Sequence, residues 1–161
     1  MSPSSLAPSP HTLEDAVDAL GIRIEDVEQH GFFNAVEAAL LKQPQAECPV
    51  QHFFIPGHYC RQITMPAGSL IVSKIHNTWH TYTVTKGFVS VVTDEQQMRV
   101  QHIRVGGEGE HFASLTEPGT RRLLFCHEET VWTTFHPTQM TDVDAIEDSI
   151  MLPNTNPLLL E

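Results

Sequence analysis

The chain has 161 residues, the length of one domain with a buried core. Nine Lys and Arg residues stand against 20 Asp and Glu residues, giving a formal net charge of −11, and there are 10 histidines. The acidic balance argues against a nucleic-acid partner, and no apolar run approaches the ~20 residues of a membrane span, so no membrane partner is expected.

The first part of the chain predicts a tail followed by helices. Residues 1–11 are rich in Ser and Pro and are expected to form a flexible tail. From Thr12, which can cap a helix, apolar residues recur at helical spacing as far as Leu20. A second helical pattern covers about 31–42. The sequence thus predicts an N-terminal helical segment over residues 12–47.

In residues 48–140 the sequence pattern is that of β-strands and no longer that of helices. Short runs rich in β-branched and aromatic residues alternate with Gly or Pro turns, at 52–55, 59–65, 69–76, 80–85, 88–93, 98–105, 122–126 and 130–135. Their even spacing is typical of an antiparallel sandwich or barrel. One of the predicted turns is Lys86-Gly87, where a hairpin is expected between two strands.

The end of the chain, residues 141–161, predicts a short helix and a tail. Asp142 or the residue before it can cap this helix, with Ile146 and Ile150 on its apolar face. The tail that follows is expected to pack against the domain or against a second subunit. Because no second domain is indicated, the chain is expected to fold as a single domain overall.

Two histidines, His76 and His80, stand four residues apart between strand-like runs. In a continuous strand they would share a face but lie about 13 Å apart, too far to bind one metal ion at about 2.1 Å each. The chain therefore has to bend at Asn77-Thr78-Trp79 if both are to bind one ion. The spacing predicts a metal site that depends on a turn between the two histidines.

This stretch resembles the first signature motif of the cupins, a superfamily of double-stranded β-helix barrels. The motif reads G-x5-H-x-H-x3–4-E-x6-G, and the chain has Gly68, Lys74, His76, His80 and Gly87 at the same spacing. The resemblance implies a mainly β fold, a double-stranded β-helix (cupin or jelly-roll barrel), with N-terminal helices and a short C-terminal helix. Since cupin barrels commonly pair, it also implies a homodimer.

A second resemblance within the chain is weaker. The run Pro118-Gly119-Thr120-Arg121-Arg122 resembles part of the second cupin motif, G-x5-P-x-G-x2-H-x3-N, and residues 48–136 resemble the small single-domain cupins often carried by bacteriophages. Lys74 stands where the first motif has a histidine ligand, and Arg122 stands where the second has its last ligand, yet neither is an ordinary metal ligand. His76 and His80 remain as metal ligands, and the candidates for further ligands are His52, His58, His136 and Tyr82. The resemblance implies a divalent transition metal, which could be Zn, Fe, Ni, Mn or Cu.

Basic side chains suggest the chemistry of the ligand. Arg61 follows a tyrosine by two residues, so both share one face of a strand. If that face lines the barrel, Arg61 and Arg122 can hold a carboxylate or phosphate by fork geometry; the alternative is that they pair with structural acids. With Lys74, Tyr82 and His136 they form the predicted ligand-binding set, which favours a small anionic molecule inside an otherwise negative protein.

Two classes of function remain open. One is a metal-dependent oxygenase, isomerase or lyase, in which the metal polarises a small polar or anionic substrate. The alternative is a non-catalytic accessory or interaction protein of the phage type, acting by host-factor binding, by sequestration or as a virion component, with a host protein as partner. Three cysteines without a C-x-x-C pattern indicate reduced thiols and a cytoplasmic location, which is the host cytoplasm if a phage encodes the chain.

Overall fold

The structure is a computed structural model that describes residues 11–159, so nearly all of the predicted tail at 1–11 lies outside the described residues. The helices are α1 (Leu13–Asp18), α2 (Ile24–His30), α3 (Phe32–Leu40), α4 (Val143–Ile150) and the 3-10 helix η1 (Pro157–Leu159). The strands are β1 (Val50–Ile55), β2 (His58–Met65), β3 (Leu70–Val72), β4 (His80–Val92), β5 (Val100–Val105), β6 (Phe112–Thr116), β7 (Leu123–Cys126) and β8 (Thr130–Pro137). Within the described range, no helix is long and apolar enough to cross a membrane.

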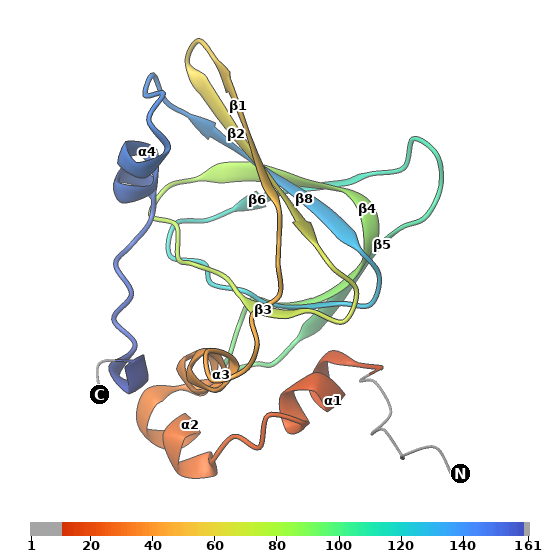
Figure 1. Ribbon diagram of the computed structural model, residues 1–161, viewed down its shortest axis with the longest axis vertical. Coiled ribbons are helices and arrows are strands. Elements are labelled where there is room, and N and C mark those ends of the chain that lie inside the picture. Colours follow the sequence, from red (N-terminus) through yellow and green to blue (C-terminus); the bar gives the residue numbers. More distant parts are fainter. Residues whose placement is uncertain (1–10, 160–161) are drawn as a thin grey trace.

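The strands form one curled antiparallel sheet (Figure 1). Its hydrogen-bonded order is β1-β2-β8-β4-β7-β3, and β5 and β6 both pair with β4. Figure 1 shows the strands wrapped around an interior, with α1, α2 and α3 below the barrel and α4 beside it. This mainly β architecture, with helices before the barrel and a short helix after it, confirms the predicted fold class.

Strand β4 belongs to both halves of the barrel. Its first half pairs with β6 and β8, and its second half pairs with β5 and β7. The predicted hairpin at Lys86-Gly87 is wrong, because the strand continues through these residues with a bulge after Val84. Gly87 has a φ of +111°, and a Cβ there would lie 2.5 Å from the carbonyl oxygen of Glu129. Glycine is needed here for the close approach of the loop before β8, and not to reverse the chain.

The sheet separates two apolar clusters. The cluster inside the barrel is formed by Met65, Tyr82, Val84, Val89, Val91, Ile103, Val105, Leu124, Cys126 and Trp132. The cluster between the sheet and the N-terminal helices is formed by Leu13, Ala16, Phe33, Val36, Val92, Leu123 and Phe125. Successive residues of β7 alternate between the two clusters, which explains why all four are buried.

Local sequence signals account for the N-terminal helices. The Thr12 side chain accepts a hydrogen bond of 3.0 Å from the backbone N–H of Asp15, so Thr12 caps α1 as predicted. Helix α2 is not predicted from the sequence, and only Gly31 separates it from α3. With a φ of +91°, this glycine adopts a conformation that other residues rarely reach, and it redirects the chain between the two helices.

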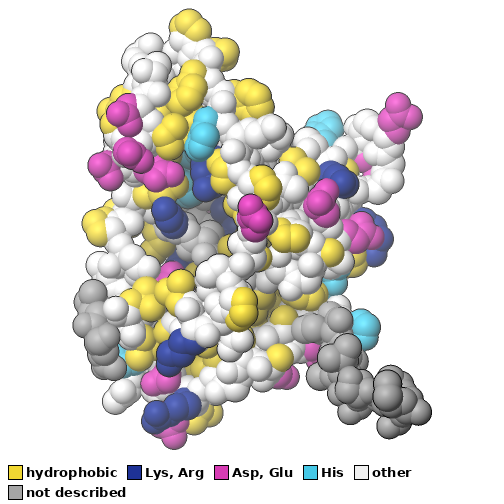
Figure 2. All heavy atoms as spheres, in the orientation of Figure 1, with side chains coloured by type: hydrophobic (Ala, Val, Ile, Leu, Met, Phe, Trp, Pro, Cys, Tyr) yellow, Lys and Arg dark blue, Asp and Glu magenta, His cyan; other side chains and the backbone are white. Residues whose placement is uncertain are grey.

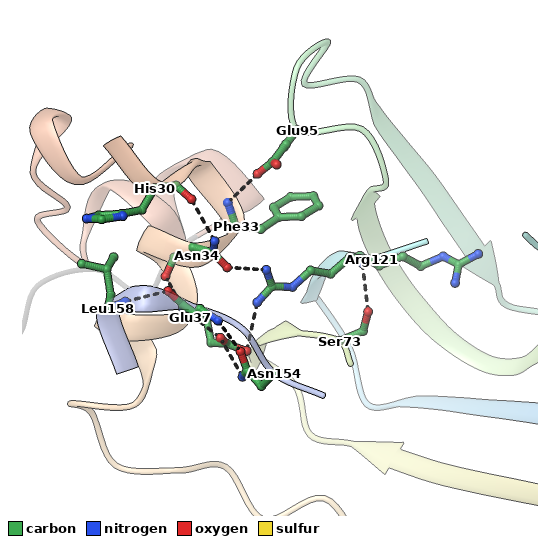
Figure 3. Close-up of polar contacts among 11 residues, drawn as sticks. His30, Phe33, Asn34, Glu37, Ser73, Glu95, Arg121, Asn154 and Leu158 are labelled. Atoms are coloured by element: carbon green, nitrogen blue, oxygen red, sulfur yellow. Dashed lines mark hydrogen bonds and ion pairs between the residues drawn. The ribbon is translucent and has the colours of Figure 1, made fainter. Parts of the chain in front are cut away.

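A polar network ties the segment after α4 to α3 and to the barrel (Figure 3). Arg121 forms an ion pair with Glu37 at 3.0 Å and donates a hydrogen bond of 2.7 Å to Oδ1 of Asn34. Asn156 donates to the backbone carbonyl of Asn34 and to Oε1 of Glu37, both at 2.9 Å, and Asn154 donates to the same carboxylate oxygen. These largely shielded contacts hold the C-terminal segment against the rest of the protein.

Candidate metal centre and ligand site in the barrel

Neighbouring strands place their inward side chains in rows across the barrel. In one row, Tyr59 of β2 pairs with His136 of β8, and His80 of β4 pairs with Thr116 of β6. The ring centroids of His80 and His136 are 4.7 Å apart. Because alternate residues of a strand share a face, antiparallel pairing brings these four side chains, distant in sequence, to one level of the barrel.

The levels below this row change from polar to apolar. In the next row, Arg61 pairs with Thr134, and Thr134 also pairs with Tyr82. One further step along the strands, Ile63 pairs with Trp132 in the apolar cluster. The interior therefore has a polar end, where histidines and arginines lie, and an apolar end that fixes the strands beneath it.

His76 reaches the histidine level from the loop between β3 and β4. The chain bends at Asn77 and Thr78, which confirms the turn that shared metal binding by the two histidines requires. The loop is held by the segment after α4: His76 forms an isolated β-bridge with Met151, and the N–H of Asn77 donates to the carbonyl of Ile150 at 2.8 Å. The C-terminal segment thus positions one member of the site.

Three histidines meet in the barrel: His76, His80 and His136. One nitrogen atom from each lies within 4.8 Å of the others, and the ring centroids of His76 lie 4.6 Å from His80 and 5.5 Å from His136. His80 is 5% exposed and His136 is 1% exposed. This is a compact and mostly buried group of three nitrogen donors.

Hydrogen bonds indicate which nitrogens are free to bind a metal. Nδ1 of His80 lies 3.3 Å from the carbonyl oxygen of Thr78, which can only accept, so Nδ1 carries the proton and Nε2 keeps its lone pair. Nε2 of His136 lies 2.9 Å from Oγ1 of Thr134, whereas its Nδ1 is buried without a hydrogen-bond partner. A buried imidazole nitrogen left in this state is one that a metal ion would satisfy.

The surroundings keep the histidines neutral. Burial, followed by the charges of His80 and Arg61, lowers the pKa of His76 to about 4. Burial, followed by the neighbouring histidines and Arg61, lowers the pKa of His136 to about 3. Burial also lowers the pKa of His80, against the hydrogen bond to the Thr78 carbonyl. At neutral pH all three rings are therefore uncharged, which is the form that binds metals.

Arg122, which directly precedes β7, also lies in this interior. The residue is 9% exposed, and Nη2 donates a hydrogen bond of 2.9 Å to Oγ1 of Thr116. Its guanidinium carbon lies 4.8 Å from the ring centroid of Tyr82, whose ring stacks on Trp132 at 4.4 Å. Burial lowers the pKa of Arg122, but a guanidinium remains charged at neutral pH, so this is a buried cation on an aromatic shelf.

Arg61 and Tyr59 come from β2, which pairs with the strand that carries His136. Arg61 is half-buried, and its Nε has no hydrogen-bond partner. The ring of Tyr59 stacks against His136 at 6.0 Å, and its hydroxyl group lies 2.6 Å from Nδ1 of His52. The charge of Arg61 reaches both His76 and His136, because it contributes to the lowered pKa of each. Both arginines therefore lie near the group of three histidines.

The remaining predicted residues take different places. Tyr82 is buried in the barrel, whereas Lys74 is exposed, although its charge also contributes to the lowered pKa of His76. Within residues 11–159, His52 and His58 lie outside the metal-ligating group. The ligand-binding roles of Arg61, Lys74, Tyr82, Arg122 and His136 stay predictions. The contributions of Thr116, Thr134 and Met151 were not predicted from the sequence, because they depend on strand pairing.

The space-filling view shows a recess on the face drawn in Figure 2. Figure 2 shows a hollow beside α4 in which Lys or Arg side chains (dark blue) lie near a His side chain (cyan). Acidic side chains (magenta) gather at the rim next to α4. A separate cavity of about 970 Å³ lies between α3, β3 and residues 147–156, and none of the three histidines lines it.

No protein-family model and no curated protein sequence matches the chain. Several solved structures are similar in part. Ectoine synthase from P. lautus is 8% identical with a TM-score of 0.49, over 71% of this chain and 81% of that one. EutQ of Clostridium difficile is 12% identical with a TM-score of 0.46, over 62% and 75% of the two chains. An RmlC-like cupin with a double-stranded β-helix fold from Methanocaldococcus jannaschii is 12% identical with a TM-score of 0.44, over 60% and 85%.

The structure shows a small barrel formed by a curled antiparallel sheet, which is the fold that the glycine and histidine spacing around β4 led us to expect. The fold alone does not assign an activity, since one barrel architecture supports many functions. Function has to be argued from the histidines and arginines of the interior.

Proposed function

We propose that the protein is a metal-dependent barrel that binds a small polar or anionic molecule, with His76, His80 and His136 as the metal ligands. The observation that carries the proposal is the meeting of three neutral imidazoles whose nitrogens lie within 4.8 Å of one another. The buried Nδ1 of His136, which has no hydrogen-bond partner, gives the second support.

The donor set suits a divalent transition metal. Two nitrogens bound to one ion at about 2.1 Å stand at most about 4.2 Å apart, so small side-chain rotations would bring the three rings to binding distance. Imidazole ligands are compatible with Zn, Fe, Ni and Cu. Three protein ligands leave at least one coordination position for a ligand or water, and a metal bound there would act as a Lewis acid on that ligand.

The protein's own residues have three roles in this proposal. The hydrogen bonds to Thr78 and Thr134 orient the rings of His80 and His136. Arg61 and Arg122 attract and orient an acidic group of the ligand. The stacked rings beneath them exclude water from the closed end of the barrel, which strengthens these electrostatic contacts.

The test is metal binding by the purified protein. The chelator-treated protein would be titrated with Zn²⁺, Co²⁺ and Ni²⁺ by calorimetry, and bound metal would be counted by mass spectrometry. We expect about one equivalent of at least one of these metals. The variants His80→Ala and His136→Ala should lose most of this binding, whereas the exposed His111→Ala should keep it.

The result that would overturn the proposal is less than about a tenth of an equivalent of every metal in the folded wild-type protein. Unchanged metal affinity in both His80→Ala and His136→Ala would also overturn the proposal. The chain would then fit the alternative of a metal-free interaction or accessory protein, for which partner binding should survive His76→Ala and His80→Ala.

A further inference from the structure

Two arginines of the barrel lack a carboxylate partner. Arg61 and Arg122 both lie near the histidines, and among residues 11–159 neither forms an ion pair with a carboxylate. The basic residue next in sequence is a useful contrast: Arg121 meets Glu37 at 3.0 Å outside the barrel.

The two guanidinium groups are also short of hydrogen-bond acceptors. Nε of Arg61 and Nε of Arg122 are buried without a partner, and the side chains that contact the rest of the Arg122 guanidinium are the uncharged Thr116 and Tyr82. Leaving a buried charged donor unpaired is unfavourable, and buried charges in proteins are ordinarily paired. An arrangement of this kind is typical of a site whose anion comes from outside the chain.

A metal ion would enlarge the imbalance. Three neutral imidazoles add no negative charge, so a divalent ion and two guanidinium groups would amount to four positive charges in the barrel. A monoanion such as acetate would cancel one of these four charges and a dianion would cancel two. A neutral ligand would cancel none of them.

We propose that the natural ligand of the barrel is a small dianion with carboxylate or phosphate oxygens; this inference rests on the proposed metal centre. Arg122 and Arg61 both bind its oxygens, while another oxygen faces the histidines. The guanidinium group of Arg122 lies over the rings of Tyr82 and Trp132, which restrict its movement. A guanidinium group fixed in this way can donate two parallel hydrogen bonds to a carboxylate or a phosphate. The shared requirement is two negative charges on a molecule small enough to contact both arginines.

The experiment uses malonate, inorganic phosphate, acetate and the neutral malonamide as probes. Each is titrated by calorimetry at constant ionic strength into the metal-free protein and into the protein loaded with Co²⁺, whose visible absorption gives a second readout. We expect malonate or phosphate to bind about tenfold more tightly than acetate, or better, with malonamide the weakest. A preference between malonate and phosphate tells whether the dianion is a dicarboxylate or a phosphate compound.

Variants test the residues. Arg61→Gln and Arg122→Gln should each weaken dianion binding by about tenfold or more, and Arg99→Gln, which removes an exposed positive charge elsewhere, should leave it unchanged. If Arg122→Gln fails to fold, the dianion affinity of Arg61→Gln alone tests the inference. Acetate binding as tightly as both dianions, or full dianion affinity in Arg61→Gln, would overturn the inference.

The outcomes separate this inference from the proposed function. If metal binds and the dianions do not, the ligand class is wrong while the metal centre stands. If no metal binds and malonate or phosphate still binds in an arginine-dependent way, the metal centre is wrong while the dianion site stands.

Discussion

The buried, neutral state of His136 makes the stability of the protein depend on pH. His136 is 1% exposed, and its pKa is lowered from 6.5 to about 3, chiefly by burial and then by the charges of His80 and His76. In the unfolded chain the same ring would have its ordinary pKa near 6.5. The unfolded state therefore binds a proton more readily than the folded state, and the stability present above pH 6.5 is lost as the pH falls.

The size of this loss follows from the two pKa values. Between them, each pH unit changes the free energy of unfolding by about 1.4 kcal/mol for one group. Lowering the pH from 6.5 to 5 should thus remove about 2 kcal/mol through His136 alone. The pKa values of His76 and His80 are lowered too, so their contributions have the same sign.

The assay is urea unfolding of the metal-free protein between pH 7.5 and pH 5. The variant His136→Phe keeps an aromatic ring against Tyr59 and removes the titrating group. We expect the wild-type protein to lose about 2 kcal/mol more than this variant over the range, and the exposed His111→Asn to behave like the wild type. Equal losses in the wild type and His136→Phe would refute the reasoning.

Two further predictions concern stability. Gly87→Ala should lower the free energy of unfolding by about 3 kcal/mol or more, because a Cβ would strike the backbone before β8 at an unfavourable φ. Gly119→Ala, with a φ of +85° but open space, should cost about 1 kcal/mol, so equal urea midpoints would contradict the close approach. Arg121→Gln should cost about 2 kcal/mol, because it removes the positive charge beside the mostly buried carboxylate of Glu37, which keeps only its hydrogen bonds from Asn154 and Asn156. Lys86→Gln removes an exposed ion pair and should cost less than about 1 kcal/mol in the same assay; a larger loss than that of Arg121→Gln would contradict the argument.

The spacing of apolar residues predicted much of the fold, because it differs between helices and strands. Alternating apolar residues located most strands, and Thr12 and Asp142 located two helix starts. Strand β6 was not predicted, since four of its five residues are not fully buried and the strand shows little alternation. The Lys86-Gly87 pair was misinterpreted because glycine at a turn and glycine at a close approach look alike in sequence.

The candidate site was predictable only in part. The spacing of His76 and His80 indicated a shared site, and the bend between them met that requirement. The third member, His136, was one of several candidates, because its position depends on the pairing of β8 with β2 and β4. Pairing between strands that are distant in sequence leaves little trace in the local pattern of residues. The homodimer stays a prediction from the sequence.

The backbone contacts of the His76 loop make the site depend on the C-terminal segment. The N–H of Leu152 donates to the carbonyl of Ile75, so residues 150–152 complete the support of His76. This segment follows every strand that the structure describes, so the loop that carries His76 is supported by a part of the chain outside the sheet. The position of His76 relative to His80 and His136 therefore depends on docking of residues 150–152 against the loop.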